Sequence, residues 1–299
     1  MTNRPLLSVV IPTFNNADAL DRCLAGWERH AADQPIELVV VEDGCRDSTL
    51  QLLEERCRAP WGQRALRWFH EDNVHELRST NRGIREARAP LVLAWQDDMF
   101  LQVSWLVPEL LRTFGRYADL GLLCLSRGLN CIPVEEPIET WEDLVDWRRL
   151  QSTIGPRPFN WIRLQEVDIV VRPWAIRRAC LDAVGLLDEA FVPTEWDEAD
   201  LSFRIRRGDW KVATHGYERL GAYFHLGSTT VGVLSDAYKQ RVVRNGLLFH
   251  DRWDDTIRRD GTRARRTWWR RPTPAGWVHT SVAAAKAFAG AIGGRNGSR

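Results

Sequence analysis

Two adjacent carboxylates, Asp97 and Asp98, stand directly after an apolar run of strand length, Leu91 to Trp95. If that run is a buried strand of an α/β sheet, its carboxyl end opens on the crevice where such sheets bind ligands. Carboxylates at this position can hold a hard divalent cation such as Mn²⁺ or Mg²⁺, and the cation can in turn hold a diphosphate. The alternative interpretation is a solvated turn that caps a helix beginning near Ser104.

Two predicted strands upstream, at residues 6–11 and 36–41, also end in polar residues. Thr13 to Asn15 follow the first strand, and Glu42 and Asp43 follow the second. Because parallel strands direct their carboxyl ends to one rim of a sheet, we expect the three polar strand ends to lie together. Helices are predicted between the strands, from about residue 17, from 47 to 58 and from 76 to 88, with a further strand at 66–69.

The second half of the chain has a looser pattern. We expect helices at residues 104–117, 141–150, 174–184, 201–207 and 235–253, and strands at 120–125, 167–171, 211–214 and 221–224. Alternating helix and strand periods predict an α/β fold, with one Rossmann-like mixed, mostly parallel sheet and helices on both faces. The predicted domain covers residues 1–255, with a nucleotide-binding half at 1–100 and an acceptor and catalytic half at 101–255.

The composition is that of a folded protein with balanced charge. Of the 299 residues, 44% are apolar, which is enough to bury a large core. Lys and Arg total 41 against 40 Asp and Glu, so the net charge does not favour nucleic acid as a partner. The six cysteines form no C-x-x-C pair, and we expect reduced thiols in a cytoplasmic protein. No apolar run in the sequence approaches the length of a membrane span.

The C-terminal residues 256–299 differ from the rest of the chain. Residues 258–271 are rich in Arg and contain two tryptophans, and residues 275–292 are predicted to form an Ala-rich, weakly amphipathic helix. Such a segment can lie on an anionic surface, which predicts peripheral contact with the inner face of the cell membrane. The alternative is a solvated extension, or one that packs on a second subunit of a homodimer.

Short segments follow one another in a recognisable order along residues 6–255: VVIPTFN (9–15), VVVEDGCRDST (39–49), NRGI (81–84), QDD (96–98), VGLLDEAF (184–191), DEADL (197–201) and FHLGS (224–228). In this order and spacing they resemble the family 2 glycosyltransferases of the GT-A fold, especially bacterial rhamnosyl- and galactofuranosyl-type transferases. The resemblance implies an inverting enzyme with a nucleoside diphosphate sugar donor, a divalent metal, and a hydroxyl acceptor on a glycan, a lipid-linked saccharide or a small metabolite.

The resemblance assigns the first two strand ends to the nucleotide pocket. Pro12, Thr13 and Asn15 would line that pocket, and Glu42, followed by Asp43, holds the place whose carboxylate usually contacts the base. The family commonly has Asp at the position of Glu42, so this side chain is one methylene longer. The alternative for Glu42 and Asp43 is a turn that caps the following helix.

The predicted helix at residues 76–88 would complete the donor pocket. The resemblance implies that Asn81 and Gly83 shape this pocket, with Asp97 also facing the donor. Arg78 lies one helical turn before the next arginine and could reach a phosphate. For Arg78 the alternative is a side chain on the solvated face of the helix.

The metal motif departs from the usual pattern, in which an Asp stands two places before the metal-binding Asp. Trp95 holds that place in this chain. We expect Asp97 and Asp98 to bind Mn²⁺ or Mg²⁺ together with His225, which ends a predicted strand where the family often carries a ligand. A packed structural histidine is the alternative for His225.

The acidic cluster at residues 195–200 should carry the catalytic base. In inverting transfer a hydroxyl attacks opposite the leaving diphosphate, so a carboxylate must accept its proton. The family commonly places this base second in a Glu-Asp pair, and Glu198 holds that place after Asp197, in swapped order. The dipole of the predicted helix should keep both carboxylates ionised. Glu198 is the predicted base, Asp197 the alternative, and Trp196 a predicted acceptor contact, because sugar rings stack on indoles.

Two other classes of protein compete with a glycosyltransferase. A non-catalytic sugar-nucleotide or glycan-binding protein on the same fold is suggested by Trp95 and by the swapped order of Asp197 and Glu198. A nucleotidyltransferase is disfavoured because no Gly-rich, basic loop follows the first strand. Donor hydrolysis separates a transferase from a binding module.

Overall fold

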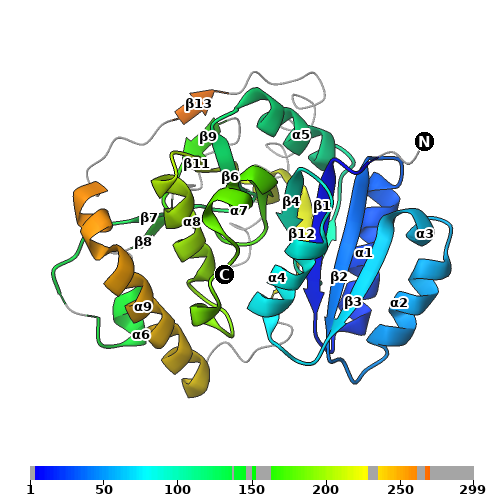
Figure 1. The fold of residues 1–299 in the computed structure, drawn as a ribbon, viewed down its shortest axis with the longest axis horizontal. Helices are drawn as coiled ribbons and strands as arrows, with labels where there is room; N and C mark the ends of the chain where they lie inside the picture. Colours follow the sequence, from blue (N-terminus) through cyan, green and yellow to red (C-terminus); the bar gives the residue numbers. More distant parts are fainter. Residues whose placement is uncertain are drawn as a thin grey trace, which may run out of the picture.

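The computed structural model describes residues 4–136, 138–145, 150–152, 163–227, 235–260 and 267–269. These residues form a nine-stranded sheet in the order β13-β9-β11-β6-β10-β4-β1-β2-β3, with helices packed on either side (Figure 1). Two short two-stranded ladders, β12-β5 and β7-β8, complete the strand pairing among them. The fold is the predicted α/β architecture.

The first half of the chain alternates strands and helices as predicted. Its elements are β1 (Leu7–Thr13), α1 (Ala17–Ala31), β2 (Ile36–Asp43), α2 (Thr49–Arg58), α3 (Gly62–Ala65), β3 (Leu66–Glu71), α4 (Glu76–Glu86) and β4 (Leu91–Ala94). β1 pairs in parallel with both β2 and β4, and β2 pairs in parallel with β3. The carboxyl ends of these strands therefore share one rim.

The second half extends the sheet with strands of both directions. Its elements are β5 (Met99–Leu101), α5 (Leu106–Arg116), β6 (Leu120–Cys124), β7 (Leu129–Cys131), α6 (Trp141–Val145), β8 (Leu150–Ser152), β9 (Arg163–Glu166), β10 (Trp174–Arg177), α7 (Arg178–Val184), η2 (Glu189–Phe191), α8 (Asp197–Arg207), β11 (Lys211–Thr214), η3 (Tyr217–Leu220), β12 (Tyr223–His225), α9 (Asp236–Asp260) and β13 (Thr267–Trp269). β10 runs antiparallel between β4 and β6, whereas β6 and β11 are parallel.

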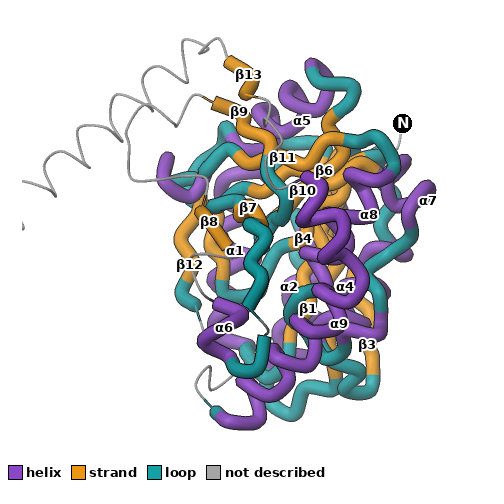
Figure 2. Tube along the Cα trace, turned by 90° about the vertical axis from the view of Figure 1, so that its left-hand side faces the viewer, coloured by secondary structure: helices purple, strands orange, loops and turns teal. Residues whose placement is uncertain are grey.

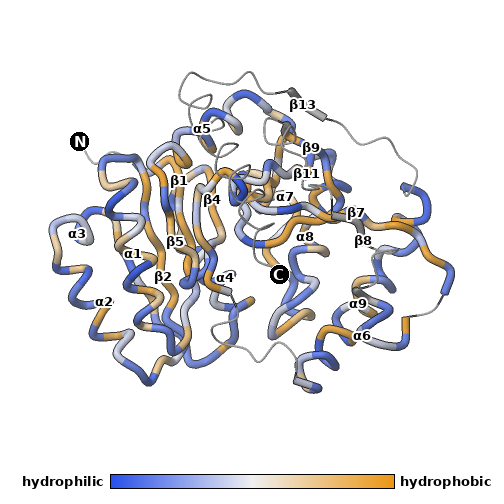
Figure 3. Tube along the Cα trace, turned by 180° about the vertical axis from the view of Figure 1, so that it is seen from behind, coloured by the Kyte–Doolittle hydropathy of each residue, from blue (hydrophilic) through white to orange (hydrophobic). Residues whose placement is uncertain are grey.

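The sheet separates two apolar cores. Val9 and Ile11 of β1 belong to the core shared with α1 and α5, whereas Val10 faces the core shared with α4, α7, α8 and α9. Every residue of β1 is buried, because alternate side chains point to opposite faces of a strand and both faces are covered. Figure 3 shows the apolar colouring concentrated along β1 and β2, with more polar residues along the surrounding helices.

Two predictions for the second half were wrong. Trp174 to Arg177 form strand β10 instead of the first turn of a helix. The short apolar run Trp174 to Ile176 fits a buried strand or a buried helix, and the periodicity of so short a run does not distinguish the two. Residues 167–171 form only one isolated bridge, between Ile169 and Leu129, instead of a strand. Asp168 turns inward there, and its carboxylate accepts a hydrogen bond from the Cys131 N–H at 2.9 Å.

The C-terminal part of the described chain remains attached to the main fold. α9 continues through residue 255 to Asp260, and β13 pairs antiparallel with β9 at the edge of the sheet (Figures 1 and 2). The predicted helix at 275–292 lies outside the described residues. Among the helices that the structure describes, none combines the length and apolar character needed to cross a membrane. All six cysteines are free.

Candidate active site

The carboxyl-terminal rim of the sheet brings the end of β1 against the residues that follow β4. Thr13 Oγ1 donates a hydrogen bond of 2.7 Å to Asp97 Oδ2, and Asn16 Nδ2 donates one of 3.1 Å to Asp97 Oδ1. Pro12 is buried within β1. Thr13 and Asp97, predicted from separate motifs, are therefore in direct contact.

Asp97 has an unusual proton affinity for a carboxyl group. Burial raises its pKa to about 7; the hydrogen bonds from Thr13 and Asn16 oppose this shift, and the neighbouring charge of Asp98 adds to it. A nearby cation would favour the ionised form. A cation that binds at this rim would therefore lower the pKa of Asp97.

Asp98 and His225 come together through strand pairing. β12 pairs antiparallel with β5, with His225 opposite Met99, and His225 Nε2 lies 3.3 Å from Asp98 Oδ1. The backbone N–H of Gly227 donates to Asp98 Oδ2 at 3.1 Å. The hydrogen bond with Asp98 raises the pKa of His225. Two residues that are far apart in sequence thus form the predicted pair.

The pair suits a hard or borderline cation that takes its remaining ligands from elsewhere. A carboxylate oxygen and an imidazole nitrogen are ligands for Mn²⁺, and Mg²⁺ sites commonly combine one or two carboxylates with substrate phosphates and water. Within the described ranges, no group of three or more His, Cys, Asp or Glu residues is placed to hold a metal. Asp98 and His225 therefore fit a cation that arrives with oxygen ligands, as a diphosphate supplies.

Trp95, at the place where the family usually has Asp, points into the core. Its indole is fully buried and makes edge contacts with Trp27 and Tyr223, with ring centroids 5.2 and 5.1 Å apart. Its Nε1 donates to the Met99 carbonyl at 2.9 Å. A carboxylate at this position would lie in an apolar environment, so the missing Asp has been replaced by a packing residue.

Glu42 is buried at the end of β2 with both oxygens engaged. Oε1 accepts the backbone N–H of Cys45, and Oε2 lies 2.5 Å from His70 Nδ1. The hydrogen bond with Glu42 raises the pKa of His70, which remains half exposed. His70 is the penultimate residue of β3 and lies beside Glu42, the predicted contact of the nucleotide base. It was missed in the sequence, where an isolated histidine after the strand predicted at 66–69 gave no signal.

Asp43 and Asn15 hold the loops of this rim in place. Asp43 accepts the backbone N–H groups of Val74 and His75 at 2.7 and 2.9 Å. Asn15 has a left-handed φ of 48°, and its Oδ1 accepts the Arg46 N–H at 2.7 Å. Both side chains therefore fix the backbone of neighbouring loops. Asp43 holds the loop before α4 and does not cap α2, which was its alternative prediction.

Asn81 and Gly83 serve the packing of α4. Asn81 Nδ2 donates to the Leu187 carbonyl at 2.8 Å, and the Leu187 N–H donates to Asn81 Oδ1 at 3.1 Å. A Cβ at Gly83 would lie 2.3 Å from Val10 Cγ1, so only glycine lets the helix approach β1 this closely. Both residues therefore fix the placement of α4, and their role in a donor pocket stays a prediction.

Arg78 extends from α4 toward η2. Its Nε lies 2.9 Å from Glu189 Oε2, and both side chains are 45% exposed. An exposed ion pair of this kind adds little stability, and Arg78 would have to leave Glu189 to contact a phosphate. The contact agrees with the alternative prediction of a side chain on the solvated face.

The first turn of α8 carries the two candidates for the base. Glu198 Oε1 accepts hydrogen bonds from Arg172 Nε at 2.7 Å and from Trp174 Nε1 at 3.4 Å. Arg172 also binds Glu76 at the start of α4, and its Nη2 lies 3.9 Å from Asp197 Oδ2. The Glu198 side chain is 18% exposed, whereas that of Asp197 is 1% exposed. An acceptor can therefore reach Glu198 more readily than Asp197.

Asp197 differs from the expectation that a helix N-terminus keeps it ionised. Burial raises its pKa well above the ordinary value, the charge of Glu198 adds to this shift, and Arg172 opposes it. Among the described residues, neither oxygen of Asp197 has a hydrogen-bond partner. Loss of water thus outweighs the helix dipole at this residue, which contributes only modestly.

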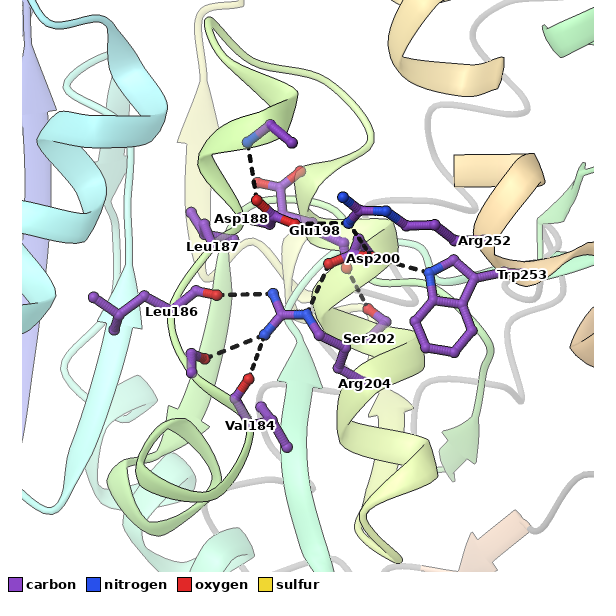
Figure 4. Close-up of polar contacts among 12 residues, drawn as sticks. Val184, Leu186, Leu187, Asp188, Glu198, Asp200, Ser202, Arg204, Arg252 and Trp253 are labelled. Atoms are coloured by element: carbon purple, nitrogen blue, oxygen red, sulfur yellow. Dashed lines mark hydrogen bonds and ion pairs between the residues drawn. The ribbon is translucent and has the colours of Figure 1, made fainter. Parts of the chain in front are cut away.

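A network behind the first turn fixes α8 relative to α9 (Figure 4). Asp200 Oδ2 accepts from Arg204 Nε at 2.7 Å, and Asp200 Oδ1 accepts from Trp253 Nε1 at 3.0 Å and from Arg252 at 3.2 Å. Ser202 Oγ donates to the carbonyl of Glu198 at 2.6 Å. The base candidate therefore stands on a rigid support, with Asp200 committed to that support.

The turn before α8 has an uncommon backbone. Glu195 and Trp196 both have left-handed φ values, 78° and 65°, which cost energy in residues other than glycine. The Tyr238 hydroxyl of α9 donates to Glu195 at 2.6 Å, and Trp196 packs against Phe249, with ring centroids 5.1 Å apart. Trp196, the predicted acceptor contact, is thus partly used to pack α8 against α9.

The chain belongs to the glycosyl transferase family 2, whose family model matches residues 8–182, more than half of its length. Two relatives named validoxylamine A glucosyltransferase are 42% identical (Streptomyces hygroscopicus subsp. jinggangensis, strain 5008) and 41% identical (subsp. limoneus) over 98 residues. These matches cover 31% of this chain and 22% and 20% of the relatives, so the chain matches about a fifth of their length.

Solved structures share the fold at low sequence identity. The crystal structure of S. aureus TarS 1–349 is 14% identical, with a TM-score of 0.50, and the match covers 86% of this chain and 75% of that one. TarS 1–349 in complex with UDP-GlcNAc is also 14% identical, with a TM-score of 0.49 and coverage of 86% and 76%. The first comparison agrees with the mixed, mostly parallel sheet of the structure and with the GT-A fold that the resemblance implies.

Proposed function

We propose that the protein is an inverting glycosyltransferase that moves a sugar from a nucleoside diphosphate donor to a hydroxyl acceptor. The observation that carries the proposal is the rim itself, where Asp98 lies between β4 and β5, His225 ends β12 and Glu198 lies in the first turn of α8. α8 runs into β11, which is parallel to β6, so the N-terminus of α8 lies toward the carboxyl ends of the strands. Glu76 links the two regions, since its charge helps to raise the pKa values of Asp97 and Asp197.

In this proposal the donor diphosphate lies at Asp98 and His225, and its nucleotide extends along the loops held by Glu42 and Asp43. A divalent cation bound there neutralises charge on the diphosphate. Glu198 accepts the proton of the acceptor hydroxyl as the new glycosidic bond forms. It is the more accessible of the two carboxylates on α8, and Arg172 fixes its orientation by the bond at Nε.

The acceptor is proposed to be a small metabolite. Support comes from the two relatives, which are named validoxylamine A glucosyltransferases. An activated glucose donor and validoxylamine A are therefore the first pair to test. Trp95 in place of a carboxylate favours a second candidate, a non-catalytic sugar-nucleotide-binding protein, and donor hydrolysis distinguishes the two.

Isothermal titration of nucleoside diphosphates with and without Mn²⁺ tests the donor site. We expect one diphosphate to bind only with the metal, and Asp98→Ala and His225→Ala each to weaken that binding at least about tenfold, since each removes a ligand. Asp33→Ala, which changes an exposed carboxylate away from the rim, is the matched control and should bind as the parent does. Parent-like affinity in both site variants would remove these residues from the donor site.

A further inference from the structure

Arg172 is a buried cation among carboxylates from two helices. Its side chain is 6% exposed, and it reaches Glu76 at the start of α4 and Asp197 and Glu198 at the start of α8. Burial opposes its charge, but the charges of Glu76, Glu198 and Asp197 more than compensate and raise the pKa of Arg172. The guanidinium is therefore permanently charged, and it ties α4 to α8 beside the proposed base.

The contacts of Arg172 with the two α8 carboxylates are unequal. Nε donates a hydrogen bond of 2.7 Å to Glu198 Oε1, whereas Nη2 lies 3.9 Å from Asp197 Oδ2, too far for a hydrogen bond. A charge-assisted hydrogen bond stabilises an ionised carboxylate much more than a longer contact does. Glu198 thus receives the main stabilisation, while Asp197 has no hydrogen-bond partner among the described residues.

Two adjacent carboxylates repel each other when both are charged, so the position of a nearby cation matters. The groups that face this cluster are Glu76 from α4, Glu195 from the preceding turn and Tyr238 from α9. Arg241 of α9 acts on Tyr238. Among these described neighbours, Arg172 is the only positive charge that the two α8 carboxylates share.

We propose that Arg172 is a positioning residue that holds the Glu198 carboxylate in a fixed orientation and gives its charge-assisted hydrogen bond to Glu198 in preference to Asp197. The inference rests on the proposed function, in which Glu198 is the base. When the acceptor oxygen bonds to the anomeric carbon, the bond from that carbon to the diphosphate oxygen breaks and its electron pair leaves with the diphosphate. The hydroxyl proton moves to Glu198, which later releases it to water.

The test compares the pH profiles of kcat/KM for Arg172→Gln and for Arg178→Gln, a control variant at another arginine. Arg178 donates to backbone carbonyls of residues 84, 87 and 89 and supports packing without a carboxylate partner in those contacts. Arg172→Gln should lower kcat at least about tenfold with little change in donor KM, and move the acid limb upward by about 1 pH unit or more. Arg178→Gln should lower Tm and leave the acid limb unchanged.

Added guanidinium should partly restore turnover to Arg172→Gln and not to Arg178→Gln, a result that a purely structural role does not predict. Arg172→Lys keeps the charge but lacks the planar fork, and we expect an acid limb between those of the parent and Arg172→Gln. An acid limb in Arg172→Gln identical to that of the parent would overturn the inference.

Asp197→Asn keeps the test decisive if the Arg172 variants do not fold, because it leaves the hydrogen bond from Arg172 to Glu198 in place. The acid limb of kcat/KM in Asp197→Asn should therefore stay at the pH of the parent. A shift of that limb by about 1 pH unit or more would overturn the inference that Arg172 acts mainly on Glu198. Absence of turnover in the parent with every donor would instead count against the proposed function.

Discussion

Replacing Trp95 by Asp restores in sequence the carboxylate that the family usually carries, yet we expect it to destabilise the protein instead of improving a metal site. The indole is fully buried, lies between the rings of Trp27 and Tyr223 and donates a hydrogen bond to Met99. The substituted side chain would point into the same apolar space, away from Asp98 and any cation near it.

The cost of Trp95→Asp follows from these contacts. Removing a buried indole costs about 3–5 kcal/mol, and leaving the Met99 carbonyl without its donor costs a further 1–3 kcal/mol or so. Burying a carboxylate adds a desolvation cost. Individual terms are not additive, but a loss of at least about 4 kcal/mol is expected, against a total stability of about 5–15 kcal/mol for a typical domain.

Urea unfolding at pH 7 measures this loss, with two companion variants. Trp95→Phe keeps a ring in the core and should lose less than about half of the Trp95→Asp amount. Trp210→Asp introduces the same side chain at a half-buried tryptophan and should cost much less. A Trp95→Asp protein that unfolds at the urea concentration of the parent and binds Mn²⁺ more tightly would refute the assignment of Trp95 to the core.

Two further predictions concern stability. Neither ring nitrogen of His215 has a hydrogen-bond partner among the described residues, and burial lowers the pKa of His215 from 6.5 to about 3. As the pH falls below 6.5, the unfolded chain therefore takes up a proton at His215 before the folded chain does. The free energy of unfolding should fall by up to about 1.4 kcal/mol per pH unit below pH 6.5. His215→Phe should remove most of this acid-side loss in urea unfolding at pH 7 and 5, and an unchanged slope would contradict the burial of a neutral imidazole. Asn81→Ala should lose about 2–4 kcal/mol in the same assay, because it removes both hydrogen bonds with Leu187; parent-like stability would argue against its packing role.

The first half of the fold was readable because its strands are buried on both faces and are separated by helices with clear turns. β1 and β2 therefore stand out as continuous apolar runs, and their polar ends meet at the rim as predicted. The approach of His225 to Asp98 was anticipated only from the resemblance. It depends on pairing between β12 and β5, which local sequence patterns do not specify.

The environment of the base could not be derived from the sequence. Arg172 follows an apolar run that was predicted as a strand, and it meets Glu76 and Glu198 only after α4 and α8 have packed. Asp197 and Glu198 are neighbours in sequence with the same local charge, and they differ in burial and in their contacts with Arg172. Long-range packing, which decides that burial, leaves no local pattern in residues 195–200.

The most direct test of the central proposal measures nucleoside diphosphate release from a panel of sugar nucleotides with Mn²⁺, for the parent, Glu198→Gln and Asp197→Asn. We predict that the parent releases diphosphate from one donor class and that Asp197→Asn remains close to the parent. Glu198→Gln should be slower by about 10²–10⁴-fold, the usual contribution of a general base. No release by the parent from any donor, or full turnover by Glu198→Gln, would contradict the proposal.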